Sequence, residues 1–510
     1  MTTGIHHVTA ITRHVQANVD FYVGFLGLRL IKRTGGYEDA EQLHLFYGDA
    51  LGSPGSVVSF LVWEDGAQGR VGLGQVSEIA FAVPPDSIGE WLVRAMAARV
   101  PVEGPLREMD ETVLRLKDPD GIIVKLVGID MPAAAPLPDP IAPRRLRGVT
   151  LLAEKADMTA MFLQRFGYRP MRTQDHIQRL ASDSDVLDVR DARGFFPGIQ
   201  GTGVMDHVAL RAKDVDDLRH MRLKLRDAAG VTTVHDRQYF TSLYVRDPSD
   251  ILLEHATDAP GFTVDEPAQT LGERLFVPPS DQQRARDLRV LLPQFAMPGE
   301  ERMPLRDLHF IHRFHQPDAP DGSTIVLLHG TGGNEADLMP LAHRINPNAQ
   351  LLGVRGRATE EGILRWFRRH DAVTFDQPDI RAEAEAFAAF VTEATRAYGL
   401  DPARTSFLGH SNGANLIGAL MQLHPGVIGQ AMLLRAIQVL ENAPAADLQG
   451  TRVLLISGES DMFGRKAPAL QSALAAAGAT LDARRIAAGH DLTPEDARIA
   501  RDWLASGLTG

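Results

Sequence analysis

The sequence of 510 residues predicts an α+β N-terminal half, built from four copies of one module, followed by a C-terminal α/β domain. Two observations predict the first half. The phrase LRLKDPDGIIVKLV from Leu114 returns as LYVRDPSDILLEHA from Leu243, and four similar opening strands accompany it. A third observation predicts the second half: after residue 304, apolar strands alternate with helical segments, which is typical of a parallel sheet covered by helices.

Each module of the first half reads as a strand, a helix and several further strands, a βαβββ pattern. The opening strands are HHVTAIT from His6, SEIAFAV from Ser77, RGVTLLA from Arg147 and DHVALRA from Asp206. We therefore expect modules one and two in 1–144 and modules three and four in 145–260. Residues 261–304 are Pro-rich and charged, which predicts an extended wrap and linker before an α/β domain at 305–510.

The composition narrows the classes of partner. The net charge is −12 and there is no basic tract, which argues against nucleic acid and anionic membranes. Because the chain has no cysteine, any metal must be held by histidines and carboxylates. The sequence shows neither a signal peptide nor an apolar run of membrane-spanning length, so we expect a cytoplasmic protein. No motif fixes the oligomeric state, and an oligomer is possible.

The repeat supplies an internal control for candidate metal ligands. The second column of the four opening strands reads His7, Glu78, Gly148 and His207, and the closing strands of modules two and four carry Lys125 and Glu254. His7, His207 and Glu254 form the ligand set of a 2-His-1-carboxylate site, which leaves positions open on Fe(II). The same ligand types also suit Mn(II). Glu78 and Lys125 instead predict a structural ion pair. Because the three ligands come from modules one and four, these two modules should face each other around the metal.

Residues 1 to about 290 resemble the vicinal oxygen chelate superfamily, and within it the ring-cleaving dioxygenases that act on hydroquinones. The matching stretches are GIHHVTAI, DFYVGFLGLRLIKRT, LHLFYGDALGSPGS, DHVAL and DRQYFTSLYVRDPSDILLEH. The resemblance implies Fe(II) on the three ligands, with Arg237 and Tyr244 near the substrate. It also implies that His6 supports a ligand or exchanges protons. Asp206 stands where a second His is frequent in this family, a departure that concerns proton handling and substrate preference.

The reaction that this resemblance implies uses a small aromatic substrate and O₂. The ring is cleaved beside a hydroxyl to give a ring-opened acid, with Arg237 holding developing negative charge and Tyr244 donating a hydrogen bond. Three alternatives stay open at this point. One is a catechol extradiol dioxygenase, and another is a glyoxalase-like isomerase, which needs a fourth protein ligand such as His44. The third is a metal-free module that binds an aromatic compound.

The second half carries the pattern of a serine hydrolase. GHSNG from Gly409 follows the strand TSFLG and precedes the helix ANLIGALM, the context of a nucleophile elbow that exposes Ser411. Asp461 follows an apolar strand and His490 lies in a late loop, which gives the order Ser, Asp, His of α/β-hydrolases. LHGTGG from Leu328 supplies an early loop, and we expect the backbone amides of Thr331 and Asn412 to form the oxyanion hole.

Residues about 305 to 510 resemble the carboxylesterase/phospholipase-like α/β-hydrolases. The stretch GVRGRATEEGILRWFRR also matches, which implies that Trp366 and nearby arginines border the site, although core packing explains Trp366 equally well. The triad suits esters, thioesters and activated carbon–carbon bonds. The sequence therefore predicts a bifunctional catabolic or detoxifying enzyme, in which the esterase acts on an ester or acyl bond and the ring-opened product is one candidate substrate.

Overall fold

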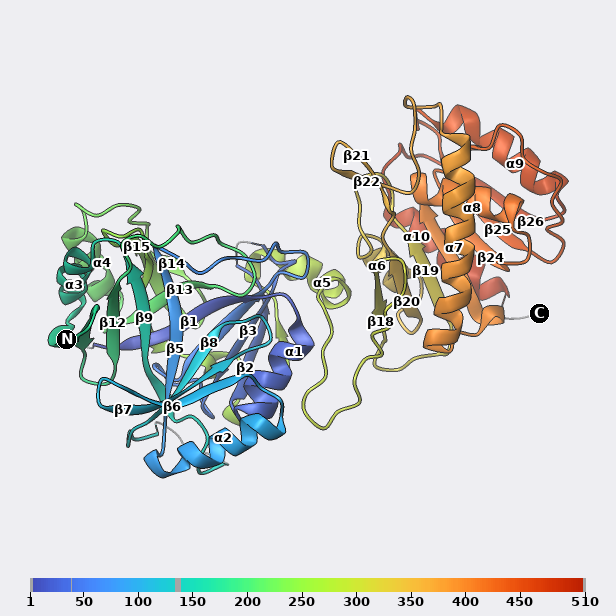
Figure 1. Ribbon diagram of the computed structural model, residues 1–510. Coiled ribbons are helices and arrows are strands. Elements are labelled where there is room, and N and C mark those ends of the chain that lie inside the picture. Colours follow the sequence, from blue (N-terminus) through green and yellow to red (C-terminus); the bar gives the residue numbers. More distant parts are fainter. Residues whose placement is uncertain (1–2, 38, 134–138, 508–510) are drawn as a thin grey trace. The chain divides into compact units, whose positions relative to one another are not determined.

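The computed structural model describes residues 3–37, 39–133 and 139–507, and its contacts divide the chain into two compact units. The first unit comprises Met1–Gln283 and Leu292–Arg302, and the second comprises Arg284–Leu291 and Met303–Gly510. Figure 1 labels their elements along the chain. In the part of the chain that the structure describes, no helix is both long and apolar enough to cross a bilayer.

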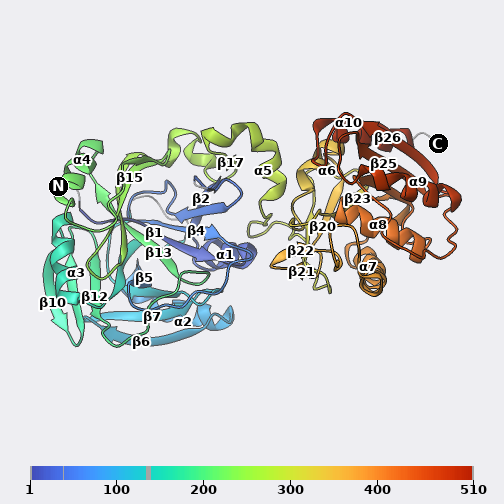
Figure 2. The same cartoon turned by 90° about the horizontal axis from the view of Figure 1, so that it is seen from above.

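A nine-stranded sheet unites modules one and four in the order β14-β15-β16-β13-β1-β4-β3-β2-β17. Module one supplies β1 (Ile5–Thr12), β2 (Arg29–Gly35), β3 (Leu43–Gly48) and β4 (Val57–Val62), and module four supplies β13 (Met205–Ala212), β14 (His235–Asp236), β15 (Phe240–Arg246) and β16 (Leu252–Pro260). The strands β1 and β13 pair antiparallel at the centre, where Figure 2 shows them with β4. Modules one and four therefore share one sheet, as the ligand columns predict.

An eight-stranded sheet unites modules two and three in the order β10-β11-β12-β9-β5-β8-β7-β6. Its strands are β5 (Gln75–Val83), β6 (Val102–Glu108), β7 (Glu111–Lys117), β8 (Ile123–Gly128), β9 (Arg145–Ala153), β10 (Arg169–Gln174), β11 (Ile177–Ala181) and β12 (Val186–Asp191). The two sheets repeat one register, because Ala80 faces Gly148 here as Ala209 faces His7 in the other sheet. Equivalent positions can therefore be compared residue by residue.

One helix follows the opening strand of every module. These are α1 (Val15–Val19) continued by the π-helical η1 (Asp20–Phe25), α2 (Ile88–Ala97), α3 (Ala156–Leu163) and α4 (Val215–Lys224). In α2 the buried positions Ile88, Trp91 and Ala95 recur at helical spacing and place one apolar face on the sheet. Asp214 caps α4, since its side chain accepts a hydrogen bond from the Asp217 amide at 2.9 Å.

The segment after β16 wraps around the first unit. Its strand β17 (Leu275–Phe276) pairs with β2, and Lys32, a fully buried lysine of β2, binds the carboxylates of Asp265 and Glu266. Further on, Gln16 exchanges two hydrogen bonds with the backbone of Ala296 at 2.8 and 3.0 Å. Between these contacts, α5 (Ala285–Leu291) belongs to the second unit, where it packs on α6 (Met339–Ile345).

The second unit is a seven-stranded sheet in the order β18-β20-β19-β23-β24-β25-β26. The strands are β18 (His312–His315), β19 (Thr324–Leu328), β20 (Gln350–Val354), β23 (Thr405–His410), β24 (Gln430–Leu434), β25 (Arg452–Gly458) and β26 (Thr480–Ile486). Only β18 pairs antiparallel within this sheet, as far as the described residues show. A short hairpin of β21 (Ala358–Glu360) and β22 (Ile363–Arg365) lies outside it.

Helices cover both faces of this sheet. The helices α7 (Gln377–Tyr398), α8 (Asn412–Leu423) and α9 (Ala467–Ala476) share one apolar cluster with Val326 and Leu328. The helices α6 and α10 (Pro494–Gly507) share another with Ile325 and Leu327. Alternate residues of β19 thus enter opposite cores, which is why parallel strands read as continuous apolar runs. This architecture is that of an α/β-hydrolase.

Candidate active sites

Three ligand-type side chains meet on the neighbouring strands β1, β13 and β16. The Nε2 atoms of His7 and His207 lie 3.0 and 3.1 Å from Oε2 of Glu254, and all three ligand atoms fall within 4.8 Å of one another. Glu254 is fully buried, and within the described part of the chain its Oε1 has no hydrogen-bond partner. A buried carboxylate oxygen without a donor is costly unless a cation binds it. The donor set and the orphaned oxygen therefore fit a metal ion.

A polar neighbour holds each of the two imidazoles from behind. His6 Nδ1 lies 2.8 Å from His7 Nδ1, and Asp206 Oδ2 lies 2.7 Å from His207 Nδ1. Burial and the nearby His7 lower the pKa of His6 to about 3, so His6 is neutral and its Nδ1 can accept the proton of His7. Both contacts fix the ring orientation through Nδ1, the arrangement that ligating histidines commonly have, and direct Nε2 of each ring toward Glu254.

The charges in this group are mutually supporting. Burial opposes ionisation of Glu254, but the charge of His7 and the hydrogen bonds of both imidazoles hold its pKa well below its ordinary value. Burial likewise disfavours a charged His207, yet its hydrogen bonds to Asp206 and Glu254 raise its pKa to about 9. Glu254 is thus kept as a carboxylate, the form that binds a metal.

A cavity of about 420 Å³ opens onto His7 and His207, a size that suits a small aromatic molecule. Its apolar lining includes Phe46, Leu61, Phe240 and Leu252. Arg237 and Tyr244 also line it, with the guanidinium carbon 5.6 Å from the centre of the Tyr244 ring and that ring 5.4 Å from the ring of His207. The structure thus brings both predicted substrate contacts to the cavity, whereas His6 lies behind His7.

His44, the candidate for a fourth ligand, stands apart from the three. It also lines the cavity, but its Nε2 contacts the Ser59 hydroxyl at 3.0 Å and its ring lies 4.1 Å from that of Phe46, tilted by 37°. Among the described residues, the only group of metal-ligand type that converges is His7, His207 and Glu254. The four-ligand alternative therefore lacks its fourth member.

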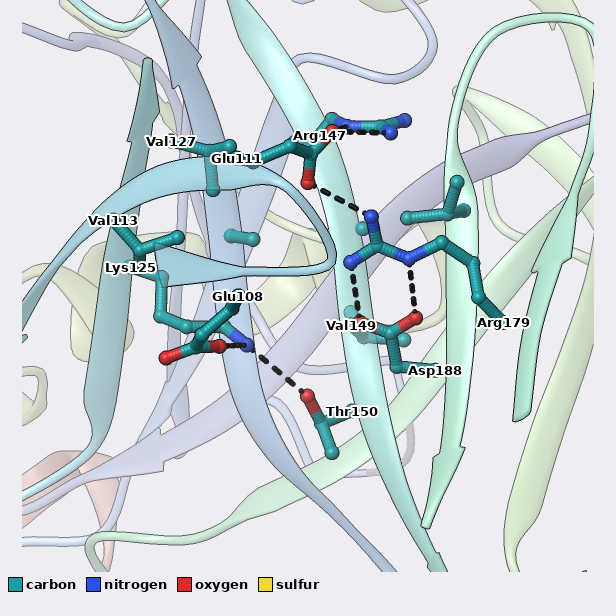
Figure 3. Close-up of a pocket in the computed structure, with 13 residues that line it drawn as sticks. Glu108, Glu111, Val113, Lys125, Val127, Arg147, Val149, Thr150, Arg179 and Asp188 are labelled. Atoms are coloured by element: carbon teal, nitrogen blue, oxygen red, sulfur yellow. Dashed lines mark hydrogen bonds and ion pairs between the residues drawn. The ribbon is translucent and has the colours of Figure 1, made fainter. Parts of the chain in front are cut away.

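The equivalent place in the second sheet is filled with ion pairs, of which Figure 3 shows Lys125 with Glu108 and Arg179 with Asp188. Lys125 corresponds to Glu254 and Glu78 to His207, and they form the expected pair at 2.9 Å. Thr150 donates to Glu78 at 2.8 Å. Gly148 corresponds to His7, and any Cβ there would collide with the carbonyl oxygen of Val186. The remaining cavity is only about 10 Å³, so this sheet has neither the ligands nor the room for a metal and substrate.

Ser411, Asp461 and His490 come together in the second unit. His490 Nε2 lies 2.9 Å from Ser411 Oγ, and its Nδ1 lies 3.1 Å from both oxygens of Asp461. Ser411 has φ of 49° between β23 and α8, a left-handed backbone that projects its hydroxyl from a sharp turn. At Gly409 a Cβ would lie 2.6 Å from the amide nitrogen of Ala414, so only glycine allows the strand and helix to approach this closely.

The predicted oxyanion donors belong to the loop after β19 and to the first turn of α8. Asn412 is the first residue of α8, where a backbone amide has no acceptor within the helix, and Thr331 is exposed in the loop after β19. The Asn412 side chain accepts a hydrogen bond from the Trp366 amide at 2.8 Å. Trp366 itself is fully buried, and its indole donates to the carbonyl of His329 at 2.9 Å. Trp366 is therefore a core residue that braces these loops.

Arg435 supports the histidine loop and was not anticipated from the sequence. It forms a fully buried pair with Asp496 at 2.7 and 3.0 Å, and it donates to the carbonyls of Gly489 and Asp491 at 2.9 and 3.0 Å. These bonds hold the residues on both sides of His490. The only sequence signal is its place after the strand β24, at the carboxyl end where α/β enzymes build their sites.

Comparison with known proteins relates the N-terminal half to dioxygenases. Residues 4–126 match the family Glyoxalase/Bleomycin resistance protein/Dioxygenase superfamily. MhqO of Bacillus subtilis, assigned as a ring-cleaving dioxygenase, is 36% identical over 54% of this chain and 91% of its own length. The chlorohydroquinone/hydroquinone 1,2-dioxygenase of Sphingobium indicum is 30% identical over 54% of this chain and 91% of its own.

The hydrolase half has a separate relative. MhqD of Bacillus subtilis, assigned as a hydrolase, is 33% identical over 188 residues, which are 36% of this chain and 94% of MhqD. One bacterium thus carries, as two proteins, counterparts of the two halves that this chain joins.

Proposed function

Because the chain belongs, through its N-terminal half, to the Glyoxalase/Bleomycin resistance protein/Dioxygenase superfamily, we propose that it is a bifunctional enzyme. The first unit cleaves the ring of a hydroquinone-type aromatic, and the second hydrolyses an ester or a related acyl bond. The observation that carries the first part is the buried group of His7, His207 and Glu254, with its orphaned carboxylate oxygen, beside a cavity of about 420 Å³. The relative from Sphingobium indicum supports the substrate class.

His7, His207 and Glu254 would hold Fe(II), and the same donors suit Mn(II). When bound, the metal would pass electrons from the aromatic substrate to O₂, so that no external reductant is consumed. The chain's own residues orient the reactants. Arg237 holds negative charge that develops on the substrate. Burial and the charge of Glu254 raise the pKa of Tyr244 well above its ordinary value, so its hydroxyl stays protonated and donates a hydrogen bond.

His6 and Asp206 act through the ligands that they touch. His6 accepts the Nδ1 proton of His7, and Asp206 accepts that of His207, so each holds one ring in position. Asp206 also lines the cavity, where its carboxylate can accept a proton from a substrate hydroxyl.

In the second unit Ser411 is the nucleophile. His490 takes the serine proton as the hydroxyl attacks the acyl carbon, and Asp461 holds the imidazole in the required tautomer. The backbone amides of Thr331 and Asn412 stabilise the oxyanion. His490 then gives the proton to the leaving group. In the second half of the reaction it takes a proton from water, which attacks the acyl-enzyme, and gives that proton to Ser411 as the acid leaves. The constraint on Ser411, with φ of 49°, supports this assignment, because strained backbone gathers at functional sites.

We also propose that the two units act in sequence, with an acyl bond derived from the ring-opened product as the hydrolase substrate. The existence of separate counterparts of both halves in one bacterium supports a shared task. This part fails if the hydrolase cleaves unrelated esters well and shows no activity on the dioxygenase product.

Oxygen uptake tests the proposal directly. Anaerobically purified, Fe(II)-loaded protein is given hydroquinone, methylhydroquinone and catechol in turn, and hydrolysis of 4-nitrophenyl acetate is followed in parallel. We expect uptake with a hydroquinone that His207→Ala abolishes and Ser411→Ala retains, and the reverse pattern for the ester. Uptake with catechol alone would change the substrate class. Absence of uptake with every compound, despite bound metal, would contradict the dioxygenase.

A further inference from the structure

Arg365, at the end of β22, lies between two contacts to the hydrolase site. On one side, Leu364 accepts a hydrogen bond from the Gly332 amide at 2.9 Å, next to Thr331 in the oxyanion loop. On the other side, the Trp366 amide donates to the side chain of Asn412 at 2.8 Å. The backbone of Arg365 is therefore fixed beside both predicted oxyanion donors.

The side chain of Arg365 is buried without adequate partners. It is 3% exposed, and over the described residues its Nε and Nη1 atoms are buried and form no hydrogen bond. The nearest carboxylate oxygen, Oε2 of Glu360, lies 3.6 Å from Nη1, too far for a hydrogen bond. The same oxygen accepts a hydrogen bond from Arg369 Nε at 2.9 Å. Two guanidinium groups thus share one carboxylate, and the cluster keeps an excess positive charge.

Unlike Arg365, the buried Arg435 of the same unit has hydrogen-bond partners. It is 2% exposed and donates hydrogen bonds to Asp496 and to backbone carbonyl oxygens. Burial, reinforced by the charge of Arg369, lowers the pKa of Arg365 from its ordinary value, which shows that its charge is poorly compensated. Unpaired buried donors cost free energy, and an incoming anion removes that cost. A carboxylate matches the planar guanidinium with two parallel hydrogen bonds.

We propose that Arg365, with Arg369 beside it, binds a carboxylate on the acyl part of the hydrolase substrate. This inference rests on the proposed hydrolase function and deepens it, because it makes anionic acyl compounds the preferred substrate class. Ring-opened acids, the products that ring cleavage generates, carry such a carboxylate. Glu360 competes with the substrate for the two arginines and so limits how tightly the anion is held.

A matched pair of esters tests the site. Mono-4-nitrophenyl glutarate and 4-nitrophenyl pentanoate share the leaving group and a five-carbon acyl chain, but only the first has a free carboxylate. We expect Arg365→Met to lower the ratio of kcat/KM for the anionic ester to that for the neutral ester by about 10- to 100-fold, the effect of a charge-assisted hydrogen bond. Arg484→Met, which removes an exposed arginine paired with Asp482, is the matched control and keeps the ratio.

A second variant moves the ratio in the opposite direction. Glu360→Gln removes the competing carboxylate and its repulsion toward an anion, so we expect the ratio to rise severalfold, and added NaCl to reduce it. A role of this cluster in folding alone would change both esters together. An unchanged ratio in Glu360→Gln and in folded Arg365→Met overturns the carboxylate site while leaving the hydrolase intact. If wild-type protein cleaves neither ester faster than Ser411→Ala does, the proposed hydrolase itself fails.

Discussion

The two sheets of the first unit share one topology and differ at the three positions that matter for chemistry. The nine-stranded sheet places His207, Glu254 and His7 where the eight-stranded sheet places Glu78, Lys125 and Gly148. Carboxylate and cation have exchanged strands: the closing strand carries the acid in one sheet and the ammonium in the other. Both arrangements neutralise a buried charge, one with histidines prepared for a metal and the other with an ion pair.

The difference shows that the module is a scaffold and that function depends on few side chains. The ammonium of Lys125 takes the place of a metal cation and pairs with Glu78. Glu108 also binds Lys125, and Arg115 binds Glu108. The cavity beside it has shrunk to about 10 Å³, against about 420 Å³ in the other sheet. The eight-stranded sheet thus has an ion pair where the other has ligand-type residues, and substitutions that exchange residues between the sheets should exchange these properties.

The largest effect is expected from Glu254→Lys, which places the residue of the second sheet in the first. An ammonium at this fully buried position would repel a cation and fill its place, so we expect complete loss of bound metal, measured by elemental analysis after Fe(II) loading. Glu103→Lys makes the same charge change at an exposed position of β6 and should keep the metal. Full metal occupancy in Glu254→Lys would refute the ligand assignment.

Lys125→Met tests the other side of the comparison. It leaves Glu78 and Glu108 without their buried cation, and removing one partner of a buried pair costs about 3 kcal/mol of unfolding free energy. Urea titration measures the loss, and metal content should stay unchanged. Lys117→Met, an exposed lysine on the neighbouring strand, provides the control. Equal stability of the two variants would show that the ion pair does not hold the second sheet.

Asp206→Asn tests how much the hydrogen bond between Asp206 and His207 contributes to metal affinity. An amide accepts the His207 proton more weakly than a carboxylate, so we expect metal affinity to fall by about 10- to 100-fold in a chelator competition. Ser77 precedes Glu78 as Asp206 precedes His207, so Ser77→Ala is the equivalent change in the sheet without a metal. An affinity that is the same in both variants would mean that Asp206 does not position His207.

Glu78→Gln should give the smallest effect and a dependence on pH. Burial alone would raise the pKa of Glu78, but the charge and hydrogen bond of Lys125 outweigh it and hold the pKa below 4.5. A carboxyl with a depressed folded-state pKa stabilises the fold above its unfolded pKa and loses this contribution as pH falls through the folded value. We expect the unfolding free energy of the wild type to exceed that of the variant by about 1 kcal/mol at pH 7. A difference that does not shrink in urea titrations below pH 4.5 would contradict the ion pair.

The sequence predicted the features that repeat or that follow the chain. Duplicated strands define equivalent columns, so the repeat pattern alone is enough to predict that His7, His207 and Glu254 group together. The order of Ser411, Asp461 and His490 follows from strands and turns in the same way. In both cases backbone geometry places the residues, because side chains at matched strand positions share one face of a sheet.

Contacts that depend on side-chain direction could not be predicted. His44 lies on a strand of the same sheet, yet its imidazole contacts Ser59 and not the ligand group. Trp366 turns into the core, and Arg435 reaches the loop around His490 from a position 54 residues before Gly489. The direction of each of these side chains depends on which rotamer the local packing allows, and this cannot be read from the spacing of residues in the sequence.

The path of the connecting segment limits how the two activities can be taken apart. A fragment that ends at Gln283 loses Leu292–Arg302, and with it the hydrogen bonds between Ala296 and Gln16. A fragment that ends at Arg302 keeps α5 but lacks α6, so the apolar Leu288 and Val290 lose their cover. A single protease cleavage or a simple gene truncation therefore removes stabilising contacts from one unit or leaves an uncovered helix on it, and point substitutions are the cleaner way to test the two units separately.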